Sequence, residues 1–370
     1  MNLVNATRFP AAYTLGLQPD ARELLVVVAK GTFSIPKAGE EAAPAAVQAP
    51  LVAADVFTGE PGFSAAHYES DFAPRKPKCD VLLNGSAYAP GGRPAPRVTV
   101  SLQVASMTKA FDVVGNRGWA KSFLALAASR PVPFVKMGIS YNNAFGGVDK
   151  SREPHRFYAL NHAGVGYHDN LAAEAITGKL LPNTEERGRE VTDPRGKYRP
   201  MALGPIGRAW QPRVGFAGTY DKNWLDNVSP FLPADFKDEY YQAAPADQQI
   251  PFPKGGEEVA LVNLTPEGRV SFRLPKLDMP IEFFMKEGPA QAKEGVIDTI
   301  LTEPDLGRFS ISWRAHLPLR RSIFEVSQVV VGRMPRGWYR AKELGKVYRR
   351  SLAEAILFPI PEAVPEEQES

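Results

Sequence analysis

The chain has 370 residues, of which 44% are apolar and 23% charged, and its net charge at pH 7 is +3. This composition excludes global disorder, and its near balance of charge argues against a nucleic-acid binder or an anionic-membrane binder. One cysteine excludes an intrachain disulfide framework, and 34 prolines disfavour a helical bundle because each removes a backbone donor.

The first ten residues contain no apolar stretch behind a basic one, so we expect no secretory signal. No run approaches the ~18 consecutive apolar residues that a membrane-spanning helix needs. We therefore expect a protein of the cytoplasm that does not enter a membrane.

Residues 1–145 form a first block of predicted strands. The run 24–35 is short, rich in β-branched residues and ended by Pro36, which is typical of a strand. Residues 79–88, which are followed by a turn at 90–92, and residues 132–141 are further predicted strands.

The clearest strand pattern in this block lies in residues 97–105. Four apolar residues alternate with polar ones from Val98 to Val104, which is the period of a half-buried strand. A turn at 106–108 leads into a second apolar run at 109–114. We therefore expect a hairpin here.

Alternation fades in residues 146–256, where Pro, Gly, Asn, Asp and aromatic residues dominate. Asn170 to Gly178 predicts a short helix that Gly178 ends, and residues 233–243 predict a second. An irregular segment this long is unusual in a compact domain and is often functional. Its aromatic residues argue against disorder, because such side chains favour burial.

Alternation returns in residues 257–340, the second predicted block. The expected elements are hairpins at 258–274 and 296–316 and strands at 281–285 and 324–331. In the last part, 341–370, apolar residues at spacings of three and four predict a helix over 341–357. An acidic tail follows at 361–370.

These elements predict a mainly β fold of antiparallel sandwich or barrel architecture. Two strand-rich blocks are joined by a long irregular segment that is rich in aromatic residues and proline and carries short helices. The pattern leaves open whether the blocks form two β domains or contribute to one large sandwich.

The sequence offers no constellation for catalysis or cofactor binding. Cys79 has no neighbouring base, and we interpret it as a buried small side chain. His155, His162 and His168 lack the i,i+4 spacing of a helix-borne metal motif, although a loop-borne site stays open. Residues 161–167 lack the lysine of a phosphate loop. We therefore expect no catalytic residue, no metal and no cofactor.

Residues 305–350 are locally basic, with eleven Lys or Arg against three acidic residues, whereas 351–370 hold five acidic residues and no basic one. Nucleic-acid binders commonly carry a strongly basic domain, which this nearly neutral chain lacks. We therefore interpret the basic run as an ionic face for a protein partner or as intramolecular charge balance.

Residues 204–249 are the most informative segment, because aromatic residues are interleaved there with prolines. Prolines restrict the unfolded chain, and aromatic residues are favoured at the energetic centres of interfaces. The alternative is that the segment only packs over a sheet. The predicted partner-binding residues are Trp210, Arg213, Tyr220, Asp221, Trp224, Tyr240, Tyr241, Gln242, Asp247, Gln248 and Gln249.

This segment resembles the signature of the family called domain of unknown function 2169. The residues that carry the resemblance are Gly204-Pro205, Trp210-Gln211-Pro212-Arg213, Ala217-Gly218-Thr219-Tyr220-Asp221, Trp224, Leu232-Pro233-Ala234-Asp235-Phe236, Tyr241-Gln242-Ala243-Ala244-Pro245 and Asp247-Gln248-Gln249. Similar motifs outside it are Lys78-Cys79-Asp80-Val81, Gly115-Asn116-Arg117-Gly118-Trp119 and Asn263-Leu264-Thr265-Pro266.

The resemblance implies a role beside the bacterial type VI secretion apparatus, as a non-enzymatic cytoplasmic adaptor or chaperone that helps to load effectors onto the spike tip. The implied partner is an effector as protein cargo, with the spike-tip protein as a further candidate. Two alternatives remain: a hydrolase with carboxylates of the central segment in a cleft, and a structural component of the secretion particle.

Overall fold

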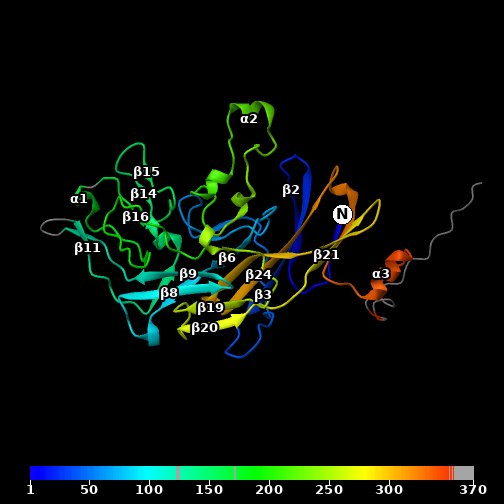
Figure 1. Ribbon diagram of the computed structural model, residues 1–370, viewed down its shortest axis with the longest axis horizontal. Helices are drawn as coiled ribbons and strands as arrows, with labels where there is room; N and C mark the ends of the chain where they lie inside the picture. Colours follow the sequence, from blue (N-terminus) through cyan, green and yellow to red (C-terminus); the bar gives the residue numbers. More distant parts are fainter. Residues whose placement is uncertain (122–125, 171, 350, 352, 354–370) are drawn as a thin grey trace, which may run out of the picture.

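The computed structural model describes residues 1–121, 126–170, 172–349, 351 and 353, and the fold is mainly β (Figure 1). Within these residues the strands form one sheet of six, one of five and one of four strands, with five two-stranded pairs around them. The mainly β prediction is confirmed, with antiparallel pairing predominant and no closed barrel among the described residues.

The six-stranded sheet lies at the centre of the molecule. In spatial order it contains β18 (Gln249–Ile250), β6 (Cys79–Leu83), β23 (Val296–Glu303), β24 (Arg308–Pro318), β3 (Glu23–Ser34) and β2 (Ala11–Leu17). Every residue from Leu24 to Phe33 is buried, because the chain covers both faces of β3. On the second face Leu51 packs against the strand, and Lys30 pairs with Asp71 at 2.9 Å. Burial on both faces explains why β3 reads as a continuous apolar run.

The five-stranded sheet contains the predicted hairpin. In spatial order it contains β17 (Thr184–Glu185), β9 (Met107–Val114), β8 (Arg97–Val104), β19 (Glu258–Val262) and β20 (Arg269–Arg273). The four apolar residues of β8 are buried and the polar residues between them are not, which confirms the predicted alternation.

The four-stranded sheet contains β1 (Asn2–Asn5), β25 (Val326–Val331), β21 (Pro280–Met285) and β22 (Gln291–Glu294). Each of the three sheets combines strands from residues 1–145 with strands from 257–340. Their apolar faces contribute to one core cluster. The two strand-rich blocks therefore share their sheets.

Short elements complete the fold. The two-stranded pairs are β4 (Val56–Phe57) with β5 (Ala66–Tyr68), β7 (Gly85–Tyr88) with β12 (Lys136–Ile139), β10 (Trp119–Lys121) with β11 (Leu126–Ala128), β13 (Phe145–Gly146) with β16 (Val165–Gly166) and β14 (Val148–Asp149) with β15 (Arg156–Phe157). The helices are α1 (Ala173–Ile176), α2 (Lys222–Asn227) and α3 (Arg336–Glu343). The 3-10 turns are η1 (Pro90–Gly92), η2 (Tyr141–Asn143), η3 (Arg213–Phe216), η4 (Asp238–Tyr241), η5 (Ala246–Gln248), η6 (Pro304–Leu306) and η7 (Ile323–Glu325).

Three details differ from the expectation for the strands. The pairs β1–β25, β6–β23 and β13–β16 are parallel. Strands β1 and β2 were not predicted, because each lies at the edge of a sheet and has no regular buried face in its sequence. The strand expected at 132–141 is only the four residues of β12.

The helix predictions need correction at their bounds. The helix expected over 170–178 is the single turn α1, and the one expected over 233–243 is the 3-10 turn η4. The helix predicted over 341–357 begins earlier, at Arg336, and ends at Glu343. Gly345 follows in the left-handed conformation that commonly ends a helix. Residues 350, 352 and 354–357 of that prediction, and the tail 361–370, lie outside the described residues.

Candidate functional site

Residues 217–236 project from the body of the protein and carry α2 at their tip (Figure 1); we call them the α2 arm. The amide of Lys237 donates to the carbonyl of Phe216 at 3.0 Å, which joins the two ends of the arm. Just inside this bond, Thr219 donates its amide and its hydroxyl to the Asp235 carboxylate, at 2.9 and 2.8 Å. The arm is therefore a closed loop with a hydrogen-bonded neck.

The tip of the α2 arm is ordered by its own side chains. Asp221 is the N-cap of α2 and accepts from the amide of Trp224 at 2.8 Å, as a short polar side chain at this position typically does. The Trp224 indole donates to the carbonyl of Phe231 at 2.9 Å, and the Tyr220 ring lies edge-on to it at 4.7 Å. These contacts give the tip a defined shape.

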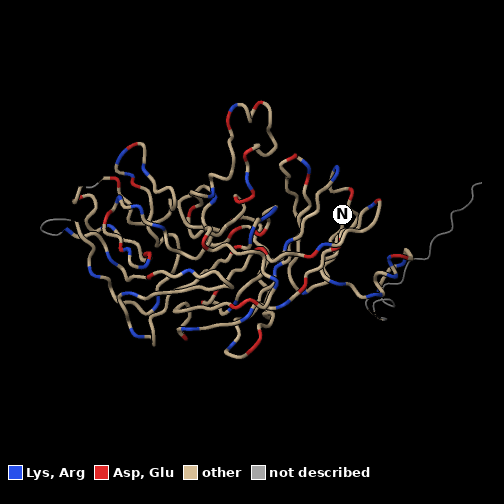
Figure 2. The backbone as a smooth tube through the Cα atoms, viewed as in Figure 1, with Lys and Arg blue, Asp and Glu red and all other residues tan. Residues whose placement is uncertain are grey.

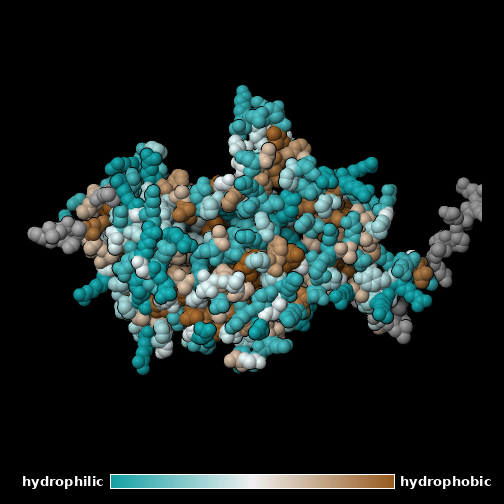
Figure 3. Space-filling model, in the orientation of Figure 1, coloured by the Kyte–Doolittle hydropathy of each residue, from teal (hydrophilic) through white to brown (hydrophobic). Residues whose placement is uncertain are grey.

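The α2 arm exposes large apolar side chains. Leu225 is 63% exposed, Tyr220 53% and Phe231 43%. Figure 3 shows hydrophobic residues gathered on the flank of this projection below a hydrophilic tip. Grouped apolar residues that project from a folded body are typical of a protein-interaction surface.

The base of the arm is held by a buried arginine. Arg213 is 1% exposed and lies in η3, directly before the arm. Its guanidinium donates to both oxygens of the Glu69 carboxylate and to the carbonyls of Ile206 and Tyr240. Glu69 also pairs with Arg208 at 2.6 Å. These bonds connect the start of the arm, the segment after it and the loop after β5.

Three aromatic rings pack on one another where the arm returns to the body. The centroids of Phe236 and Tyr241 are 5.4 Å apart, and each ring also contacts that of Tyr240. Burial, together with the nearby Asp238 carboxylate, raises the pKa of Tyr241 to about 12. Tyr241 is therefore a neutral packing residue, and both tyrosines remain partly exposed.

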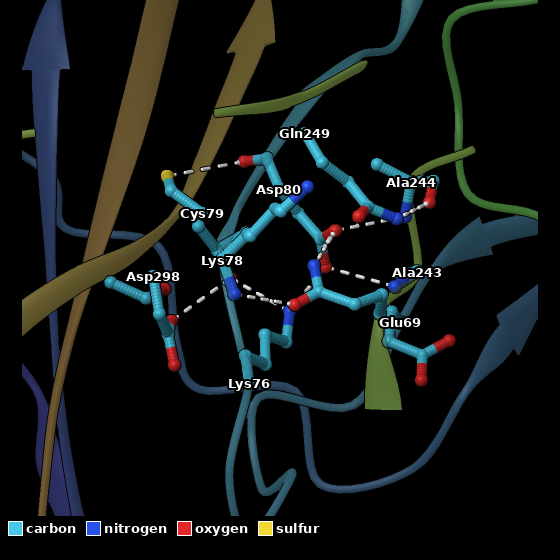
Figure 4. A network of polar contacts seen from close by, with 12 residues as sticks. Glu69, Lys76, Lys78, Cys79, Asp80, Ala243, Ala244, Gln249 and Asp298 are labelled. Carbon is cyan, nitrogen blue, oxygen red and sulfur yellow. Dashed lines mark hydrogen bonds and ion pairs between the residues drawn. The ribbon is translucent and has the colours of Figure 1, made fainter. Parts of the chain in front are cut away.

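A buried carboxylate fixes the segment that follows these rings (Figure 4). Asp80 on β6 is fully buried and accepts from the Lys76 ammonium at 2.7 Å and from the amides of Ala243 and Ala244 at 2.9 and 3.1 Å. The side-chain amide of Gln242 donates to it at 2.6 Å. Burial by itself lowers the pKa of Lys76, but Asp80 and Asp298 outweigh this effect and raise it. Residues 242–244 are thus bonded to the central sheet.

A second polar cluster holds the end of the segment. Lys109 on β9 donates to the side-chain oxygen of Gln248 at 2.7 Å and to Asp247 at 3.3 Å. Arg199 pairs with the other oxygen of Asp247 at 2.6 Å. The amide of fully buried Gln248 donates to two backbone carbonyls, and that of Gln249 to the carbonyl of Ala244.

The predicted partner-binding residues therefore fall into two groups. Those at least partly accessible are Tyr220, Asp221, Trp224, Tyr240, Tyr241, Asp247 and Gln249. The interior ones are Trp210, Arg213, Gln242 and Gln248. The side chains of these four residues form hydrogen bonds to, or pack against, other residues of the protein. They therefore influence partner binding only by positioning the exposed residues over them. Trp210, for example, packs edge-on against Tyr141 at 5.5 Å.

Residues that sequence reasoning missed include Glu69, Lys109 and the exposed pair Leu225 and Phe231. Asp80 had been singled out only as part of a familiar motif. An isolated acidic or basic residue carries no sequence signal of burial, because its partner lies far away in the chain. Leu225 follows Trp224 directly, and nothing in the run from Lys222 to Asn227 distinguishes an exposed leucine from a buried one.

The hydrolase alternative requires carboxylates in a cleft. A cavity of about 380 Å³ is lined by Tyr68, Tyr141, Glu303 and Asp305, among other residues. Glu303 accepts from Tyr68 at 2.6 Å and from Arg308 at 2.8 Å. Burial alone raises the pKa of Asp305, but hydrogen bonds from Ser86, Lys136 and Tyr88 outweigh this effect and lower it. A general acid needs the opposite shift.

Four acidic residues of the central segment are also engaged. Asp221 caps α2, Asp235 holds the arm neck, Asp238 pairs with Arg75 at 3.0 Å, and Asp247 binds Lys109 and Arg199. Among the described residues, no group of three or more His, Cys, Asp or Glu is arranged to hold a metal ion. His162 instead packs against Phe157, with ring centroids 4.5 Å apart.

The comparisons with known proteins identify a family. A family model described as "Uncharacterized protein conserved in bacteria (DUF2169)" matches residues 20–314. No curated protein and no solved structure matches the chain. In the part of the chain that the structure describes, no helix has the length and apolar character to cross a membrane. Because the matched region spans well over half of the sequence, the chain belongs to the DUF2169 family of bacterial proteins.

Proposed function

We propose that this protein is a non-enzymatic adaptor or chaperone that holds a protein cargo on its α2 arm. The observation that carries the proposal is the combination of exposed Tyr220, Leu225 and Phe231 with a base locked by Arg213 and Glu69. A surface that is already ordered loses little conformational entropy when it binds. An arm of this kind suits a protein that holds another protein.

The cargo that we propose is an effector of the bacterial type VI secretion apparatus, which the adaptor helps to load onto the spike tip in the cytoplasm. This part of the proposal is supported by the resemblance of residues 204–249 to domain of unknown function 2169. The engaged state of the central carboxylates supports a binding role over hydrolysis.

The proposal assigns distinct roles to the two groups of residues. Tyr220, Leu225 and Phe231 contact the cargo, and Trp224 supports them through its hydrogen bond to the Phe231 carbonyl. The buried residues keep the arm at a fixed orientation to the sheets. Substituting a contact residue therefore weakens binding without unfolding the protein.

Co-purification of the full chain with the effector encoded beside it tests the proposal. The double variant Leu225→Asp with Phe231→Asp places two charges on the arm, and we expect it to fold and to lose the effector. The matched control is Phe63→Asp, since Phe63 is 65% exposed and lies outside the arm. The variants Trp224→Ala and Tyr241→Ala test whether the supporting aromatic rings are needed for effector binding. Full recovery of the effector by folded arm variants would show that the cargo binds elsewhere.

A further inference from the structure

A groove of about 660 Å³ lies outside the α2 arm, between the turn that joins β21 to β22 and the segment around η7. We propose that this groove is a second docking site and that it takes an acidic segment of a partner protein that also carries a large apolar side chain. The residues that carry the proposal are Lys286, Arg320, Arg321 and Phe324, all of which line the groove.

The basic groups in the groove are available to a ligand. Arg320 and Arg321 are exposed, and neither side chain forms an ion pair with the residues that the structure describes. The neighbouring Glu325 is already engaged, because its carboxylate accepts from the amides of Arg321 and Ser322 and completes a capping box at η7. Its carboxylate is fixed by these backbone amides and also attracts Arg320 through space, which leaves Arg321, and in part Arg320, open to another carboxylate.

The groove also has an apolar wall. Phe324 is 72% exposed, and the Lys286 ammonium lies 5.9 Å from the centre of its ring. Met285, Pro289 and Pro318 line the same groove. A ligand that presented only charge would leave this wall uncovered, so an apolar side chain beside the acidic ones fits better.

The positive charge continues along the outer face of the four-stranded sheet. Trp338 of α3 packs against Phe284 of β21 at 5.8 Å, and the Lys342 ammonium lies 4.4 Å from the Phe284 ring. Arg336 and Arg340 point to solvent on this helix and make no ion pair among the described residues. In the tube view, basic residues mark both α3 and the sheet end beside it (Figure 2).

Charge complementarity therefore selects an acidic partner, and two observations favour a protein over a nucleic acid. Glu287 and Glu325 line the groove and repel a continuous phosphate backbone, whereas a peptide can place its carboxylates selectively. Trp338 packs at a steep angle against Phe284, and the Lys342 ammonium lies over its ring at 5.3 Å, so one face of the ring is already covered and does not stack on a base. A second site outside the arm lets the adaptor hold two proteins at once.

Fluorescence anisotropy with the full chain and a labelled peptide that alternates glutamate and leucine tests the groove. We expect the peptide to bind and Arg320→Glu with Arg321→Glu to weaken binding by at least about tenfold. Phe324→Ser weakens it as well. The matched control, Arg93→Glu with Arg130→Glu, makes the same charge change at exposed arginines elsewhere and leaves binding unchanged. Circular dichroism shows that each variant is folded.

Three results would overturn the proposal. The first is equal binding of a peptide in which glutamine replaces every glutamate, because the basic groups would then play no part. The second is tighter binding of a DNA duplex that the Arg320→Glu with Arg321→Glu variant abolishes. The third is peptide binding that appears only after Glu362, Glu366, Glu367 and Glu369 are changed to glutamine, since the groove would then belong to the chain's own tail. None of these results bears on the proposal that the α2 arm binds the cargo.

Discussion

Arg213 and Glu69 form a two-point ion pair, with Nη1 at 3.1 Å and Nη2 at 2.5 Å from the carboxylate, although 144 residues separate them in the sequence. Arg213 is 1% exposed and immediately precedes the α2 arm, whereas Glu69 belongs to the layer that covers the central sheet. The pair therefore fixes the residues that precede the arm to the loop after β5.

Replacing Glu69 by glutamine leaves the buried Arg213 cation without its charge partner. Removing one member of a buried ion pair typically costs about 3–5 kcal/mol, so we expect the free energy of unfolding to fall by about that amount. Urea unfolding followed by circular dichroism measures the change. The control is Asp226→Asn, an exposed aspartate of the arm, which should leave the midpoint unchanged. Equal midpoints for Glu69→Gln and the wild type would refute the role given to this pair.

Asp80→Asn should destabilise the protein by a similar mechanism. The substitution removes the negative charge that balances buried Lys76. It also replaces one acceptor oxygen with an NH2 group, which then faces some of the four groups that donate hydrogen bonds to Asp80. We expect a loss of about 3–5 kcal/mol in thermal or urea unfolding. Asp238→Asn breaks a partly exposed pair with Arg75 and should cost less than about 1 kcal/mol. A smaller effect at Asp80 than at Asp238 would be inconsistent with the network of Figure 4.

Local patterns in the sequence predicted the strands but not the polar connections between them. The alternation in β8 and the apolar run of β3 reflect burial of neighbouring residues on a pleated surface, which is a short-range property. By contrast, Asp80 binds Gln242 across 162 residues, and no local pattern encodes such a partner.

The sequence indicated the segment that contains the projecting arm but not which of its residues are exposed. Residues 204–249 do contain the projecting arm, because aromatic residues interleaved with proline indicate a stiff, anchored segment. The same residue types also favour burial, which is why Trp210 lies in the core and exposed Leu225 was missed. Sequence composition alone does not distinguish these two environments.

Lys109 gives the protein a pH-dependent stability. Burial outweighs the attraction of Asp247 and lowers the pKa of Lys109 to about 8, from its usual 10.5. Between these pH values the unfolded chain holds a proton that the folded protein has released, so unfolding takes up a proton and stability rises with pH. The contribution is about 3 kcal/mol over the whole window.

The free energies of unfolding of the Lys109→Met variant and of the wild type, measured at several pH values from about 8 upward, isolate this effect. The wild type should gain stability relative to the variant as the pH increases. The stability of Lys222→Met, at an exposed position on α2, should change with pH in the same way as that of the wild type. A difference between wild type and Lys109→Met that stays constant with pH would contradict the lowered pKa.

Gly218 is required by the geometry of the arm neck. Its φ is +85°, and an added Cβ would lie 2.9 Å from the Asp235 carboxylate and 3.1 Å from the amide of Phe236. Gly218→Ala should therefore cost more than the about 1–2 kcal/mol of the left-handed conformation alone. Gly39→Ala, at φ +84° with no atom within 4 Å, measures that conformational cost by itself. Equal losses of stability would show that the neck can accommodate a side chain.

The most direct measurement of the central claim is amide hydrogen exchange on the full chain, alone and with bound effector. Our account predicts that the effector slows exchange in residues 217–236, with little change in the buried strands of the central sheet. Unchanged exchange throughout the arm in a saturated complex would contradict the claim that this arm holds the cargo.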